Sequence, residues 1–440
     1  MAPLAPRRAQ TAEEAALVAA AARLFPEGTR GPGLDDGHKF VVDRASGSRL
    51  WDRSGNEYVD YLLGSGPHVL GHAHPAVLEA LGRAAAGGTS HLVLSAAAIE
   101  LAEVLCETVP CAEKVSFHST GSEATFFSLR LARAATGRDK VLKFEGAFHG
   151  MHDYAMVSTQ WRWDPPPFPE GVADTGGIPA AVVGEVLVAP YNDLAATEAI
   201  IAEHADELAA VIVEPMQRTF VPAPGFLAGV QRACAAAGAV LVFDEVVTGF
   251  RLALGGGQER YGVVPDLCAI GKTVSGGLPF AAICGRVDLL ELADPLRRLS
   301  GEAFTMQTGT YSSNPLAMHV ALAVIAELRR PGFYERLEVT GRTLMDGIGT
   351  AFAAVGRPVQ VLGEPSAFHT WFSDQPVVDH RSSLAADAFA NVVLTDLLLE
   401  RGVLRAHEKC FVSAAHTDED VAITLEAFAD AAVALAEALP

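Results

Sequence analysis

The sequence lacks the features of a nucleic-acid-binding, membrane or secreted protein. Acidic residues outnumber basic ones by 53 to 33, the formal net charge is −20, and no Lys/Arg cluster stands out. Nucleic acid and anionic membrane surfaces are therefore not expected partners. No apolar run is long enough to span a bilayer, and Glu13 and Glu14 interrupt the Ala-rich N-terminal stretch where a signal peptide would be apolar.

Cysteine is scarce: six residues, none in a CxxC pair. Most lie within apolar helical or strand patterns, so buried free thiols are expected rather than a disulfide framework. This favours a reducing compartment, and we predict a cytoplasmic protein. No metal site is predicted.

From about residue 75 onward, helical stretches alternate with short apolar runs. This alternation predicts an α/β fold with a mostly parallel sheet covered on both faces. Uninterrupted apolar runs are what strands buried on both sides require. The expected strands cover residues 114–117, 140–143, 185–188, 209–213, 239–243 and 267–270.

The 440 residues suffice for two to three domains. We expect helices at 11–24 and 314–330, a small antiparallel meander within 39–62, and a Pro-rich surface loop at 161–177. The expected parts are an N-terminal segment (1–74) with a substrate-side loop that packs with the small domain, a large domain (75–330) and a C-terminal small domain (331–440).

A first candidate site is Ser-Thr-Gly-Ser-Glu-Ala-Thr at 119–125, between a predicted strand and a helix that opens at about Glu123. Free amides and the positive end of the helix dipole suit a phosphate there. An ordinary capping box from Thr120 to Glu123 would explain the same residues. The pattern alone leaves both readings open.

A second candidate is Asp244, which ends the apolar run 239–243. A carboxylate is costly to bury without a cationic partner. It also lies at the carboxyl end of a parallel strand, where such sheets bind ligands. A ligand cation, local loop amides or an Arg would satisfy it.

The third candidate is Lys272, in a Gly/Ser-rich turn just past the run 267–270. The chain has only six lysines, and the other five lie in charged or alternating contexts that predict solvated side chains. A lysine desolvated among small residues has a lowered pKa and can attack carbonyls. The turn is not a Walker A loop, because Asp266 stands where its first glycine belongs.

Together the three sites fit pyridoxal 5′-phosphate, which needs a phosphate cradle, a carboxylate at its ring nitrogen and a Schiff-base lysine. Over nearly its whole length the chain resembles class III (subgroup II) aminotransferases, and within them glutamate-1-semialdehyde aminomutase and β-amino-acid transaminases. The matching segments are 50–52, 70–75, 121–124, 143–150 (Lys-Phe-Glu-Gly-Ala-Phe-His-Gly), 213–216, 243–251, 271–272 and 309–315.

The resemblance implies a fold-type I pyridoxal-phosphate-dependent transferase. Its large domain would hold a mostly parallel, seven-stranded sheet covered by helices, beside a smaller α+β domain. The enzyme would be a homodimer with active sites at the subunit interface. Lys272 would hold the cofactor as a Schiff base and later move a proton, while Asp244 would pair with the pyridine nitrogen.

The resemblance also implies roles for other residues around the cofactor. Phe148 stands where the family commonly has a Tyr stacked on the pyridine ring, so stacking would be kept and the phenol lost. The remaining implied contacts are Gly121 and Ser122 to the phosphate, Val246 to the other ring face, and Thr310 to the phosphate of the partner subunit's cofactor.

Substrate recognition is expected from Arg30, near where β-amino-acid transaminases bind a carboxylate, and from Glu408, which matches a glutamate of the aminomutase branch. An ordinary surface Arg would equally explain Arg30. An aromatic, Pro-rich segment at 159–169 replaces the Gly/Ser/Thr-rich lid of the aminomutase. A mutase must retain its intermediate, so we expect a ping-pong transaminase acting on a small amino donor and a carbonyl acceptor, with an aminomutase as the alternative.

A nicotinamide oxidoreductase or a non-catalytic binder could also use a doubly wound sheet. No GxGxxG follows an early strand, however, and both Asp244 and Lys272 are present. An amino-transferring enzyme is therefore the favoured reading.

Overall fold

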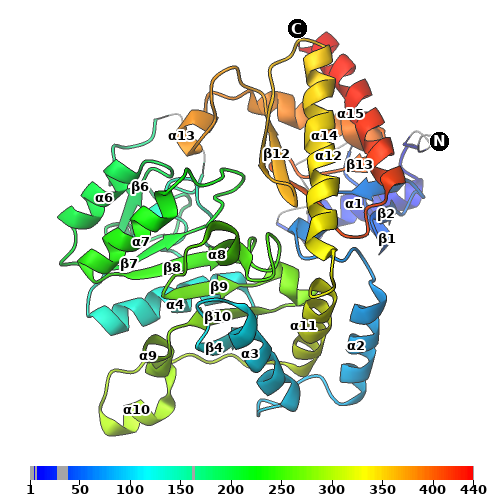
Figure 1. Ribbon diagram of the computed structural model, residues 1–440. Helices are drawn as coiled ribbons and strands as arrows, with labels where there is room; N and C mark the ends of the chain where they lie inside the picture. Colours follow the sequence, from blue (N-terminus) through cyan, green and yellow to red (C-terminus); the bar gives the residue numbers. More distant parts are fainter. Residues whose placement is uncertain (1–3, 5–6, 27–37, 161–163, 440) are drawn as a thin grey trace. The chain divides into compact units, whose positions relative to one another are not determined.

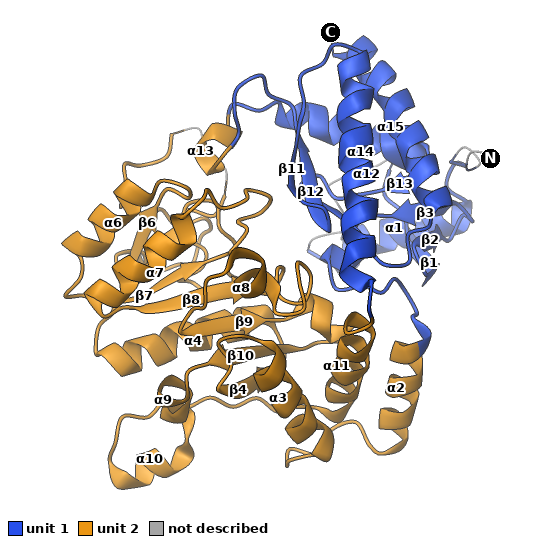
Figure 2. Cartoon of the chain, viewed as in Figure 1, with its two compact units in different colours: residues 1–75, 331–377, 385–440 blue, residues 76–330, 378–384 orange. Residues whose placement is uncertain are grey.

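The computed structural model describes residues 4, 7–26, 38–160 and 164–439 (Figure 1). The chain forms two compact units (Figure 2). Unit 1 contains residues 1–75, 331–377 and 385–440, and unit 2 contains residues 76–330 and 378–384.

Unit 2 is built on a sheet that has seven strands among the described residues, in the order β4-β10-β9-β8-β7-β5-β6. All run parallel except β10, which pairs antiparallel with both β4 and β9. The bounds are β4 (Lys114–His118), β5 (Lys140–Phe144), β6 (Val186–Ala189), β7 (Leu208–Val213), β8 (Val240–Glu245), β9 (Leu267–Ile270) and β10 (Ala281–Gly285). The predicted α/β class and mostly parallel sheet are confirmed, whereas β10 was not predicted.

Helices cover this sheet, as its apolar strands require. Helix α4 (Gly121–Thr136) contacts five of the strands, and α6 (Leu194–Glu203) and α7 (Phe226–Ala237) lie on the other side (Figure 1). The other α-helices described in this unit are α2 (Pro75–Ala86), α3 (Ala96–Thr108), α5 (Ala180–Val183), α8 (Gly256–Tyr261), α9 (Val287–Leu290), α10 (Pro295–Ser300), α11 (Pro315–Leu328) and α13 (His380–Ser383).

Unit 1 combines the two ends of the chain. Its larger sheet has the order β1-β2-β3-β13, in which the first three strands form the predicted antiparallel meander and β13 pairs parallel with β3. The bounds are β1 (Val42–Ser46), β2 (Arg49–Asp52), β3 (Glu57–Asp60) and β13 (Val403–Leu404). A second sheet pairs β12 (Ala367–Trp371) with β11 (Gln360–Glu364) and β14 (Cys410–Phe411).

The described α-helices of unit 1 are α1 (Ala12–Leu24), α12 (Phe333–Ala354), α14 (Ala388–Glu400) and α15 (Asp418–Ala438). Helices α1 and α11 confirm the predicted helices at 11–24 and 314–330, and residues 164–177 contain no helix or strand. The six cysteines are free; five are buried as expected, but Cys106 is exposed. Among the described helices, none combines the length and apolarity that crossing a bilayer demands.

Candidate active site

The candidate site lies where parallel strands of the unit 2 sheet end, the edge at which such sheets bind ligands. The loops after β4, β5, β8 and β9 carry the residues singled out in the sequence. The contacts between these loops show which of the predicted site residues lie close together.

The loop after β4 leads into α4, which begins at Gly121 rather than at Glu123 as expected. The capping box is present: the hydroxyl of Thr120 accepts from the amide of Glu123, whose carboxylate accepts from Thr120. It does not compete with an anion for the amides of Gly121 and Ser122, because first-turn amides have no acceptor within the helix. Both readings of this motif are therefore compatible.

Close packing fixes this helix start against two other loops. A Cβ on Gly121 would lie 3.0 Å from Cγ2 of Val246, which follows β8. A Cβ on Gly150 would lie 2.5 Å from Oγ of Ser122, and that hydroxyl accepts from the amide of Met151 at 3.1 Å. A larger residue at either glycine would displace the start of α4.

Asp244 is the penultimate residue of β8, with only 5% of its surface exposed. Its Oδ1 accepts from the amide of Val246 at 3.1 Å, and its Oδ2 lies 2.8 Å from Nδ1 of His149. Nε2 of His149 is buried without a hydrogen-bond partner among the described residues. A loop amide therefore does contribute, as one reading proposed, and a histidine takes the place of the expected Arg.

His149 is a candidate functional residue to which the sequence assigned no role. It could have been found, because it lies inside segment 143–150, which matches the aminotransferase family. A histidine that hydrogen-bonds to a carboxylate holds the carboxylate in one orientation. It thereby sets the direction from which the carboxylate can accept a hydrogen bond from another group.

Lys272 directly follows Gly271 after β9 and begins a short 3-10 helix, Lys272–Ser275. Its φ of 37° lies in the left-handed region that non-glycine residues rarely adopt. Burial lowers the pKa of its amine, while the negative charges of Asp244 and Glu214 act in the opposite direction. The amine therefore lies within the field of the Asp244 carboxylate.

The prediction that only Lys272 is desolvated is wrong, because Lys143 on β5 is 1% exposed. Its sequence context suggested alternation, but β5 is an interior strand with both faces covered. Burial lowers the pKa of Lys143 to about 7. Its Nζ donates to the carbonyls of Ala155 and Val157 and to Thr159 Oγ1, at 2.6–2.8 Å.

Phe148 lies in the loop after β5 with 36% of its surface exposed. Its amide donates to Oε1 of Glu214 at 2.9 Å. The ring is thus anchored by its backbone while one part of it stays accessible, as a stacking surface requires.

The other expected site residues are not joined to this cluster by the described contacts. Thr310 is exposed in unit 2, and Glu408 is exposed in unit 1. Arg30 lies outside the described residues.

Pyridoxal phosphate fits the residues present. The first-turn amides of α4 are suited to bind its phosphate. Asp244, whose two oxygens are each held by a hydrogen bond, offers the carboxylate that the ring nitrogen needs. Lys272 supplies an amine whose pKa burial lowers. Within the described residues, no group of His, Cys, Asp and Glu is arranged to hold a metal ion.

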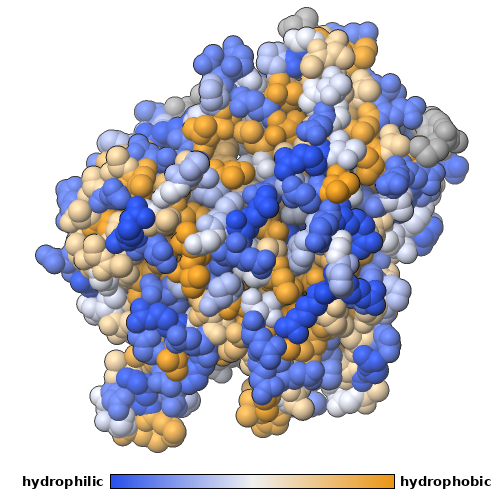
Figure 3. Space-filling view, viewed as in Figure 1, coloured by the Kyte–Doolittle hydropathy of each residue, from blue (hydrophilic) through white to orange (hydrophobic). Residues whose placement is uncertain are grey.

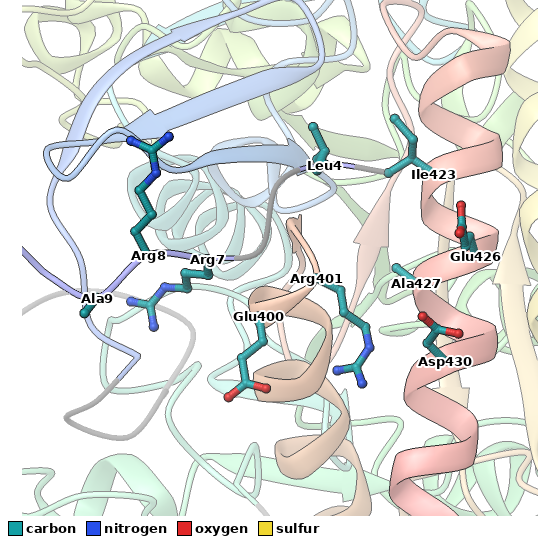
Figure 4. A pocket seen from close by; sticks show the side chains of 10 residues that line it. All are labelled: Leu4, Arg7, Arg8, Ala9, Glu400, Arg401, Ile423, Glu426, Ala427 and Asp430. Carbon is teal, nitrogen blue, oxygen red and sulfur yellow. The ribbon is translucent and has the colours of Figure 1, made fainter. Parts of the chain in front are cut away.

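A separate cavity of about 590 Å³ lies in unit 1 (Figure 4). Its walls come from the N-terminal segment, the end of α14 and α15; they comprise Leu4, Arg7, Arg8, Ala9, Glu400, Arg401, Ile423, Glu426, Ala427 and Asp430. None of the predicted site residues that the structure describes lines this cavity.

Known proteins resemble this chain over most of its length. Residues 34–424 match the family model "Aminotransferase class-III". A glutamate-1-semialdehyde 2,1-aminomutase of Roseiflexus castenholzii is 40% identical, covering 96% of this chain and 97% of that protein.

Solved structures give the same picture. An omega-transaminase from Sphaerobacter thermophilus is 34% identical with a TM-score of 0.90, covering 96% of this chain and 97% of the other. A transaminase with pyridoxal phosphate bound is 29% identical with a TM-score of 0.87, covering 96% and 98%. The fold is that of fold-type I pyridoxal-phosphate transferases, and the cofactor is pyridoxal 5′-phosphate. The chain belongs to the class-III aminotransferases.

Proposed function

We propose that this enzyme is an aminomutase of the glutamate-1-semialdehyde type, which moves an amino group within one small molecule. The observation that carries this choice is the 40% identity, over nearly the whole length of both chains, to a protein of that name. It reverses the order of preference drawn from the sequence, where the 159–169 segment favoured an intermolecular transaminase.

The proposed roles follow from the contacts at the sheet edge. When bound, the cofactor supplies a carbonyl that takes up amino groups and a ring that accepts electrons. Because burial lowers the pKa of Lys272, a larger fraction of its amine is neutral near pH 7 and able to attack a carbonyl or accept a proton.

Asp244 would accept a hydrogen bond from the protonated ring nitrogen. The amide of Val246 and the ring of His149 hold its two oxygens, so the carboxylate needs little reorganisation when it does so. The amides of Gly121 and Ser122 would bind the phosphate at the positive end of α4. Phe148 and Val246 would flank the ring.

An intermolecular transaminase is the second candidate, and the 34% identical omega-transaminase structure favours it. The described residues 164–169 add a second observation. Arg381 donates to the carbonyl of Pro166 at 2.7 Å, and its guanidinium lies 3.8 Å from the ring centroid of Phe168. A segment fastened to α13 in this way is less suited to act as a retaining lid.

We propose that the enzyme acts in the cytoplasm as a homodimer, with Thr310 reaching the partner's cofactor and Arg30 and Glu408 orienting the substrate. Thr310 is exposed and adjoins Tyr311, which is 67% exposed. Leu92, Val93 and Leu94 are also at least 73% exposed, and Figure 3 shows apolar surface at the segment before α3. Exposed apolar side chains of this kind commonly become buried between subunits.

The deciding experiment uses glutamate 1-semialdehyde as the sole substrate. We expect many turnovers into its positional isomer with no added acceptor. Chromatography of the amino products measures this conversion. Conversion that stops after one turnover and resumes only when a keto acid or aldehyde is added would establish the transaminase instead.

A further inference from the structure

Arg218 stands in the loop after β7, at the same edge of the sheet as Lys272, and was not among the expected site residues. Its backbone φ is 58°, in the left-handed region that is strained for a residue with a side chain. Such strain persists only where the surrounding structure enforces it, and it concentrates at functional sites.

The surrounding contacts do enforce this conformation. Glu214 accepts from the amide of Phe148 through Oε1 at 2.9 Å and from the amide of Arg218 through Oε2 at 3.4 Å. Gln217, which is fully buried, donates through Nε2 to the carbonyl of Glu145 at 2.6 Å. One carboxylate thus ties the backbones of Phe148 and Arg218 together.

The side chain of Arg218 is directed to the proposed stacking residue. Its Nε donates to the carbonyl of Gly146 at 3.1 Å, and its guanidinium lies 5.6 Å from the ring centroid of Phe148, within cation–π range. Burial is the largest cause of the lowered pKa of Lys272, and the positive charge of Arg218 also lowers it. Arg218 is therefore partly buried near the ring of Phe148, and its charge acts on the amine of Lys272.

We propose that Arg218 binds the carboxylate of the amino substrate beside Phe148, so that the site takes amino acids in preference to simple amines. A guanidinium presents its N–H groups in a planar fork that matches a carboxylate. Carboxylate binding beside Lys272 would also orient the carbon that carries the amino group. This inference deepens the proposed amino-transfer function and rests on it.

The test compares amino donors that differ only in a carboxylate. β-Alanine is paired with propylamine, and 4-aminobutyrate with butylamine, where a methyl group replaces the carboxylate. With holoenzyme in single turnover, the loss of the cofactor's visible absorbance gives a rate constant and an apparent affinity for each donor. Arg218→Gln should lower the efficiency for the acids roughly 10- to 100-fold, the range for a lost hydrogen bond to a charged group, and barely change that for the amines.

Two further variants separate charge from structure. Arg218→Lys keeps the positive charge without the fork and should fall between wild type and Arg218→Gln. Arg232→Gln, which removes an exposed arginine on α7, should match wild type for both donor classes. An equal loss for acids and amines in Arg218→Gln would make Arg218 structural, and no loss for either would also overturn the proposal.

A binding measurement distinguishes failure of this inference from failure of the proposed function. Calorimetric titration of the holoenzyme with propionate, and with 1-propanol as the neutral control, requires no reaction. Arg218→Gln should weaken propionate binding roughly 10-fold or more and leave propanol unaffected. Propionate binding that depends on Arg218, in an enzyme that transfers no amino group, would sustain the carboxylate site and refute the function. Propionate binding that is equal in wild type and Arg218→Gln would refute the site.

Discussion

Two lysines of unit 2, Lys143 on β5 and the half-buried Lys272 just after β9, can be compared directly, and burial lowers the pKa of both amines. Lys143 lies within β5 and donates to three oxygens of residues 155–159. Lys272 lies beyond the end of β9, in a left-handed backbone conformation and within the field of Asp244. Burial therefore does not distinguish the lysine that we propose to be catalytic. Its position just after a strand end, where the charge of Asp244 acts on it, does.

The largest effect is expected at Lys272. Lys272→Ala removes the amine that we propose attacks the carbonyl and moves the proton, so turnover should fall by about 10⁴-fold. Thermal melting should show a folded protein, because the alanine leaves no polar group to satisfy. Turnover close to that of wild type would remove Lys272 from the mechanism.

Asp244→Asn keeps the shape of the side chain and removes its charge. If Asp244 pairs with the ring nitrogen as proposed, that nitrogen would lose its proton in the variant, and we expect a rate about 10²- to 10³-fold lower. The affinity for pyridoxal phosphate, measured by fluorescence titration, should change less. A variant with normal rates would show that Asp244 has only a structural role.

His149 is expected to act through Asp244. His149→Phe retains a ring but loses the nitrogen 2.8 Å from Oδ2, and loss of such a supporting contact commonly costs 10- to 100-fold. The pH dependence of the cofactor's visible spectrum should shift as well. An unchanged spectrum together with reduced stability would indicate that His149 only packs.

The contrasting lysine should affect stability more than rate. Lys143→Met removes the donor to the carbonyls of Ala155 and Val157 and to the hydroxyl of Thr159. A buried group left without a partner typically costs about 1–3 kcal/mol, although the Ala155 carbonyl can still accept from Thr159 Oγ1 at 2.9 Å. The unfolded lysine titrates near 10.5 and the folded one near 7, so between these values the unfolded state binds more protons. The contribution of Lys143 to stability should therefore rise as pH increases from about 7 to 10.5.

Denaturant titrations across that pH range check the sign. Lys143→Met should be less stable than wild type and should lack the part of the rise that Lys143 causes. A variant with the same pH slope as wild type would show that Lys143 does not titrate in this window.

The sequence predicted the parts of this fold that depend on local pattern. Apolar runs identified six strands of the large sheet, and their order along the chain placed Asp244 and Lys272 at strand ends. Strand β10 was missed because Ala281–Gly285 is made largely of small residues. The burial of Lys143 was missed because alternation within one strand says nothing about which strands lie beside it.

The contacts of His149 and Arg218 could not be predicted for a different reason. Each depends on loops that are far apart in the sequence and meet only at the sheet edge. His149 meets Asp244 across 95 positions of sequence, and Arg218 meets Gly146 across 72. The hydrophobic periodicity of a sequence contains no information about such long-range contacts.

The central claim is that Lys272, rather than Lys143, forms the bond to pyridoxal phosphate. Borohydride reduction of the holoenzyme makes that bond permanent, and mass spectrometry of the digested protein locates it. We predict a pyridoxyl group on the peptide that contains Lys272 and none on the peptide that contains Lys143. A label on Lys143, or on any lysine other than Lys272, would contradict the assignment.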